Sequence, residues 1–174
     1  MVCILARMMK TCGTASSLFA DATSAVRTWP DRRAWLEALS LLAVLMVFAL
    51  IAGSGAHLFT FASVTNWPEL IAIALIAIII PALGEEMVFR VLLAGRRGRW
   101  RAAVALALFV LWHPAQLWLG LPMAQPVFAD PAFLAITAAL GLACTISWRR
   151  SGSVWPAVAM HWALVVMWKG LAGG

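Results

Sequence analysis

The chain has 174 residues, of which 64% are apolar and only 11% are charged. A soluble domain of this size needs more charge to cover its surface, so this composition excludes an ordinary soluble protein. The formal net charge of +6 would suggest nucleic acid in a soluble protein, but here the basic residues lie in short loops between apolar stretches. We therefore expect lipid as the main surrounding medium and no nucleic-acid partner.

Five stretches are apolar enough to be predicted as transmembrane helices, each of which needs about 20 residues. In chain order they cover residues 35–52, 69–94, 101–119, 131–148 and 154–171. This pattern predicts an all-α integral membrane protein, with a bundle of about five transmembrane helices in a domain at residues 35–172. Residues 1–34 show no convincing signal peptide and are expected to form a cytoplasmic arm.

The basic residues follow the positive-inside rule for five spans. Eleven of the 13 Lys and Arg residues lie before the first span, between the second and third, or between the fourth and fifth. Lys169 lies toward the opposite side, and Arg90 lies within a span. We therefore expect a protein of the cell membrane with its N-terminus in the cytoplasm and its C-terminus outside.

The second predicted span contains the ionisable residues Glu85, Glu86 and Arg90. Each would cost a few kcal/mol if it faced lipid without a partner, so we expect them inside the bundle. Glu86 and Arg90 are four residues apart and can pair on one helix face. Glu85 lies about 100° around the helix and is free for chemistry. For Glu86 and Arg90, a structural ion pair and a direct catalytic role both remain open.

Two histidines of other predicted spans lie at a similar depth. Counted from the cytoplasmic helix ends at about 1.5 Å per residue, Glu85 lies about 15 Å deep, His113 about 18 Å and His161 about 11–14 Å. Either histidine alone would be taken for a hydrogen-bonded core residue. The shared depth instead predicts a polar site in the cytoplasmic half of the bundle.

One carboxylate and two imidazoles in a secluded site suit hydrolysis. Glu85 could take a proton from a water molecule that then attacks a carbonyl, while the histidines position the water or donate to the oxyanion. Glu85, His113 and His161 could instead bind a zinc ion that supplies the nucleophilic water. Both hypotheses fit these residue types, and peptide-bond hydrolysis at membrane depth is the natural reaction.

Three motifs follow one another on separate predicted helices. Residues 85–90 read EEMVFR and match the pattern EExxxR, residues 109–113 read FVLWH and match FxxxH, and residues 150–161 end in His161. Together they resemble the CPBP family of intramembrane proteases, which includes type II CAAX prenyl endopeptidases and the lysostaphin resistance protein A-like domain. The resemblance covers about residues 81–171, within a protease-like core of about 69–171.

This resemblance implies an intramembrane endopeptidase in which Glu85 activates water with help from His113, while His161 helps to form the oxyanion site. The expected supporting residues are Glu86, Arg90 and Phe109. The resemblance favours a glutamate-activated water without a cofactor over the zinc alternative. It also implies that the substrate is a membrane-associated protein or peptide, which could be prenylated. Some family members process prenylated CAAX proteins, and others are linked to bacteriocin processing and self-immunity.

One position departs from the family pattern. Where the family commonly has Asn or Asp four residues after its last histidine, this chain has Val165. Gln116, Trp112 or Trp162 could supply a substitute donor; without one, the rate could fall about 10²-fold or more. Val165 therefore leaves open a catalytically silent relative that acts as a membrane scaffold or bacteriocin-immunity factor. The Glu and His residues leave open a small proton-coupled carrier in which they form a relay.

Overall fold

The structure is a computed structural model that describes residues 19–59, 66–122 and 124–171. In these ranges the regular elements are all helices, and no strand occurs. After a short helix over residues 19–27, they are α2 (Arg32–Gly55), α3 (Trp67–Ala77), η1 (Ile78–Leu83), η2 (Glu86–Ala94), α4 (Arg99–Trp118), η3 (Pro126–Ala129), α5 (Pro131–Ser151) and α6 (Trp155–Leu171). Most of the predicted arm, residues 1–18, lies outside the described ranges.

Capping residues in the sequence explain where the helices begin and end. The Asp31 side chain accepts a hydrogen bond from the backbone N–H of Ala34 at the start of α2. Asp130 caps α5 in the same way, directly before Pro131, whose missing N–H costs nothing at a first helical position. Gly152 ends α5 in the left-handed conformation, with φ 69°. These local signals set helix ends that hydropathy alone places only approximately.

The predicted helix over residues 69–94 is interrupted in its middle. Ile80 has φ −104° and ψ 65°, outside the helical region, directly before Pro81. Proline lacks an N–H and disfavours helical geometry in the residue before it, which accounts for the break. The segments around the break, η1 and η2, are π-helical. Glu85 and Glu86 thus lie on a helix that differs from the regular α-helix expected from the sequence.

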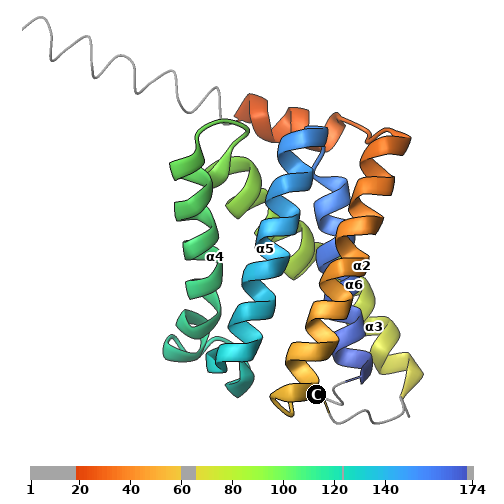
Figure 1. Cartoon of the computed structure of the whole chain (residues 1–174), viewed down its shortest axis with the longest axis vertical. Helices are drawn as coiled ribbons and strands as arrows, with labels where there is room; N and C mark the ends of the chain where they lie inside the picture. Colours follow the sequence, from red (N-terminus) through yellow and green to blue (C-terminus); the bar gives the residue numbers. More distant parts are fainter. Residues whose placement is uncertain (1–18, 60–65, 123, 172–174) are drawn as a thin grey trace, which may run out of the picture.

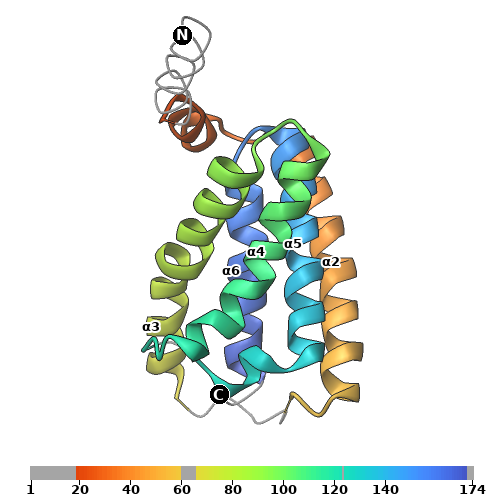
Figure 2. The same cartoon turned by 90° about the vertical axis from the view of Figure 1, so that its left-hand side faces the viewer.

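Helices α5 and α6 form the centre of the bundle (Figures 1 and 2). Helix α5 contacts α2, α4, η2 and α6, whereas α6 contacts α2, α3, η1 and α5. Helix α4 packs mainly on η2 and α5. The polar motifs on η2, α4 and α6 therefore meet around α5 instead of being spread over the bundle.

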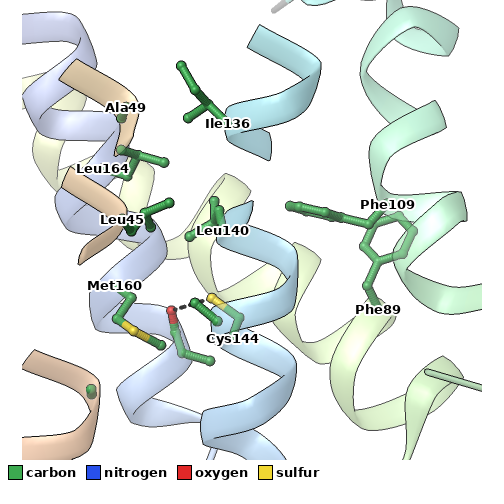
Figure 3. Packing of buried hydrophobic residues seen from close by; sticks show 12 residues of the cluster. Leu45, Ala49, Phe89, Phe109, Ile136, Leu140, Cys144, Met160 and Leu164 are labelled. Carbon is green, nitrogen blue, oxygen red and sulfur yellow. Dashed lines mark hydrogen bonds between the residues drawn. The ribbon is translucent and has the colours of Figure 1, made fainter. Parts of the chain in front are cut away.

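The largest buried cluster joins α2, α5 and α6 to the aromatic residues of α4 and η2. Figure 3 shows the aliphatic side chains of α2, α5 and α6 on one side and Phe89 and Phe109 on the other. Cys144 of α5 lies in this cluster, and its thiol donates to the Ala157 carbonyl of α6 at 3.5 Å. The cluster thus holds the two central helices against the aromatic side of the site.

Three of the described helices are long and apolar enough to cross a membrane: Arg32–Gly55, Trp67–Ala94 and Pro131–Ser151. Large apolar side chains on their outer faces, such as Val44 and Leu75, are exposed, as lipid contact requires. Helix α6 has 17 residues, about 25 Å, which is shorter than a membrane core of about 30 Å. All five predicted stretches are helical, but the count of five crossings stays a prediction.

Arginine side chains tie together the helix ends at one end of the bundle, where α2, α4 and α6 begin and η2 and α5 end (Figure 1). The Arg101 guanidinium donates to the carbonyls of Leu92 and Leu93, both at 3.1 Å. Arg149 donates to the carbonyls of Gly95 and Gly98, at 3.3 and 2.6 Å. The loop between η2 and α4 is therefore closed by side chains of α4 and α5.

Candidate active site

Glu86 is held on both carboxylate oxygens. The Arg90 Nε–H donates to Glu86 Oε2 at 2.9 Å, and both side chains are fully buried. On the other oxygen, Oε1, the Nδ1 atom of His161 from α6 lies at 2.9 Å. The predicted pairing of Glu86 with Arg90 is therefore present. Both carboxylate oxygens of Glu86 therefore already contact a side chain of the site.

The contact with Glu86 also determines how His161 can act. A carboxylate can only accept, so Nδ1 of His161 is the protonated nitrogen in this hydrogen bond. In the neutral imidazole, Nε2 is then a free acceptor, and in the charged form it is a second donor. Nε2 lies 3.9 Å from Glu85 Oε2. A carboxylate thus orients His161, and the other ring nitrogen faces a second carboxylate.

Glu85 differs from Glu86 in having one oxygen without a hydrogen-bond partner. Its Oε1 accepts a hydrogen bond from the indole N–H of Trp112 on α4 at 3.1 Å. Its Oε2 is buried and has no hydrogen-bond partner among the described residues. The side chain keeps 16% of its surface exposed. Glu85 is therefore the carboxylate with a free oxygen, as its position relative to Arg90 predicted, but Trp112 restrains it.

His113 lies in an aromatic environment. Its Nδ1–H donates to the Phe109 carbonyl at 3.0 Å, one turn earlier on α4. The rings of Phe109, Phe128 and Phe133 lie 5.3, 5.3 and 5.5 Å from the imidazole, centroid to centroid. In the described part of the chain no hydrogen bond or ion pair joins His113 to Glu85. The structure thus brings His161, more than His113, next to Glu85.

Phe109 connects the two histidines. Its buried ring makes edge-to-face contacts with His113 at 5.3 Å and with His161 at 5.9 Å. The Arg90 guanidinium lies 4.1 Å above the same ring, in cation–π contact. Gly141 of α5 makes room for this stack, because a Cβ there would lie 2.9 Å from the Phe109 ring. Phe109, expected to be a supporting residue, lies at the centre of the arrangement.

The proposed zinc ligands do not form a cluster here. Among the described residues, no three His, Cys, Asp or Glu side chains converge as a metal site. Glu85 and His161 are close to each other, but His113 is bonded to a backbone carbonyl and surrounded by rings. In this arrangement His113 thus lies apart from the pair formed by Glu85 and His161.

Two of the three candidates for an oxyanion donor in place of position 165 are tryptophans whose N–H groups are already hydrogen-bonded. The Trp112 N–H is bonded to Glu85, and the Trp162 N–H donates to the Ala74 carbonyl at 2.8 Å. Gln116 is almost fully buried in α4. Both indole donors thus already have acceptors. The contact of Trp112 with Glu85 was not predicted, and its only sequence signal is the position next to His113.

Comparison with known families agrees with these motifs. Residues 66–167, more than half of the chain, match the family described as type II CAAX prenyl endopeptidase Rce1-like. The chain belongs to this family. The matched region contains all the residues of the site, from Glu85, directly before η2, to His161 on α6. No curated protein and no solved structure shows a significant match.

Membership of this CAAX-type family, which is generally a family of proteases, confirms the resemblance found in the three motifs. Together with the apolar helices, it identifies the chain as a membrane protein of the CPBP group. The family also implies a protein substrate in a membrane environment.

Proposed function

We propose that the chain is an intramembrane endopeptidase that hydrolyses a peptide bond of a membrane-associated protein, with Glu85 as the general base. The observation that carries this proposal is the buried, unpartnered Oε2 atom of Glu85, which lies 3.9 Å from Nε2 of His161. This distance is too long for a hydrogen bond between the two atoms. One water molecule at about 2.8 Å from each atom would bridge them.

In the proposed reaction, the bridging water loses a proton to Glu85 as its oxygen attacks the carbonyl carbon of the peptide bond. The tetrahedral intermediate then collapses, the C–N bond breaks, and the proton on Glu85 passes to the leaving amine. The products are a carboxylate and an amine, so water is the only other reactant. Donors aimed at the developing oxyanion lower the barrier of the first step.

The other residues of the site have supporting roles in this proposal. Glu86 keeps Nδ1 of His161 protonated and fixes the ring, as a carboxylate does for the histidine of a hydrolase triad. Arg90 balances the buried charge of Glu86. In its charged form, His161 donates from Nε2 to the oxyanion. His113 assists with its own Nε2, because its Nδ1–H is bonded to Phe109.

We also propose how the protein is oriented and what it cleaves. The loop and helix ends that carry Arg96, Arg97, Arg149 and Arg150 lie at one end of the bundle, which the positive-inside rule places in the cytoplasm. Substrates would then be proteins at the cytoplasmic leaflet. The family makes a lipid-modified tail the first substrate class to test.

A comparison of protein termini in living cells tests the proposal. Membranes from cells that express the wild type, Glu85→Gln or Glu69→Gln would be compared by terminal-peptide mass spectrometry. Glu69 is the matched control, because it is an exposed carboxylate on α3. We expect a set of termini that disappears with Glu85→Gln and remains with Glu69→Gln. Identical termini in all three, at equal expression, would refute the protease and support a silent relative.

A further inference from the structure

The indole of Trp112 contacts Glu85 at the position where the proposed reaction needs a fixed geometry. Trp112 lies on α4, and its N–H donates to Glu85 Oε1 across the contact between α4 and the Glu85 helix. We infer that Trp112 is a positioning residue: its N–H holds Oε1 so that Oε2 faces Nε2 of His161. This goes beyond the family motif, in which only Phe109 and His113 are specified on this helix.

A free glutamate cannot keep this orientation by itself. Its side chain has three rotatable bonds, and either oxygen could turn toward a donor. A hydrogen bond to one oxygen fixes the plane of the carboxylate and therefore the direction of the other oxygen. Tryptophan suits this role, because its rigid ring has only two side-chain torsions and loses little entropy when it is fixed. The restraint would prevent Glu85 from turning away from the water position.

Two other tryptophans of the bundle do not donate their indole N–H to a carboxylate. The N–H of Trp148 on α5 is buried without a hydrogen-bond partner in the described residues. The N–H of Trp162 donates to a backbone carbonyl, that of Ala74. The fold therefore tolerates an unpaired indole N–H, and a backbone carbonyl can also satisfy one. The pairing of Trp112 with the carboxylate that has a free oxygen is consistent with a role in the site.

The hydrogen bond itself can be tested without any activity. The full chain, labelled with ¹⁵N-tryptophan and reconstituted in lipid nanodiscs, gives an indole N–H signal for Trp112 that Trp112→Phe removes. We expect Glu85→Ala to move this proton upfield, because its acceptor is lost, while the signal of Trp118, 81% exposed on the same helix, stays in place. A Trp112 signal that does not move in Glu85→Ala would overturn the inference.

The consequence for catalysis rests on the proposed function and is tested separately. With an internally quenched farnesylated peptide as the probe, we expect Trp112→Phe to lower kcat about 10- to 100-fold with little change in KM, the size of a small misplacement of a reacting group. Trp118→Phe, the matched control, should keep the wild-type values. Equal kcat in Trp112→Phe and wild type would overturn the positioning role.

Two further results separate the possible failures. If Trp112→Phe lowers the folded yield, 3-benzothienylalanine at position 112 keeps the ring shape without the N–H, and it should show the same loss of kcat. A wild-type kcat for this replacement would show that only the packing of the ring matters. If the wild type and Glu85→Gln both leave the probe uncut, the proposed function fails for this substrate class, while the NMR experiment still decides the contact.

Discussion

Replacing Arg90 with Met tests whether the buried ion pair holds the site together. Breaking a buried pair costs about 3–5 kcal/mol, because a charge is left without its partner, and the contact with Phe109 adds about 2 kcal/mol. Two terms reduce the loss. The hydrogen bond between His161 and Glu86 remains in the variant. The substitution also removes the Nη1 and Nη2 atoms of Arg90, whose burial without hydrogen-bond partners costs the wild type about 1–3 kcal/mol. These terms leave an expected loss of about 2–6 kcal/mol, and the remaining bond from His161 places it in the lower half of this range, at about 3 kcal/mol.

The free energy of unfolding would be measured by SDS titration in mixed micelles, followed by circular dichroism. Arg97→Met, in an exposed loop position, is the control and should lose less than about 0.5 kcal/mol. The double variant Glu86→Gln with Arg90→Met should be more stable than Arg90→Met alone, because no buried charge remains unpaired. A loss below about 1 kcal/mol in the single variant would refute the reasoning, since exposed ion pairs contribute that little.

Three other substitutions probe the packing around the site with the same titration. Gly141→Ala places a Cβ 2.6 and 2.9 Å from side chains of α4 and should lower the free energy of unfolding by about 1–3 kcal/mol. The control Gly55→Ala, whose Cβ would have nothing within 4 Å, should leave it unchanged, and equal losses in the two variants would contradict the steric explanation. Trp162→Phe removes the donor to the Ala74 carbonyl and should cost about 1 kcal/mol, so an unchanged midpoint would show that this bond does not stabilise the interrupted helix. Glu37→Gln breaks the ion pair between Glu37 of α2 and Arg150 of α5, whose side chain is mostly exposed. The free energy of unfolding should therefore fall by less than about 1 kcal/mol, and a larger loss would be inconsistent with that exposure.

Much of the fold could be predicted because a chain in lipid must satisfy its backbone hydrogen bonds within each segment, so long apolar stretches become helices. The stretch 131–148 illustrates this: the helix runs from Pro131 to Ser151, between the cap at Asp130 and the glycine at position 152. The interruption at Ile80 was not predicted, although Pro81 is visible in the sequence. The π-helical segment η1 around it packs against α6, and no local sequence pattern encodes this contact.

The site could be predicted only where its contacts lie within one helix. The spacing of Glu86 and Arg90 is enough to predict their pairing. Contacts between helices depend on how each helix is rotated about its axis, and α4 is apolar on most of its surface, so its sequence does not determine this rotation. Neighbouring residues lie about 100° apart. Trp112 and His113 therefore cannot both face Glu85, and the structure turns the tryptophan toward it.

The arginine contacts around the loop between η2 and α4 also have a consequence for the order of synthesis. The side chain that closes this loop over Gly95 and Gly98 belongs to Arg149, 54 and 51 residues further along the chain. While a ribosome is still making α5, the end of the helix that carries Glu85 lacks these bonds. His161, which completes the site, is translated later still. A nascent chain therefore has no assembled site, and in the proposed function hydrolysis would begin only after α6 has joined the bundle.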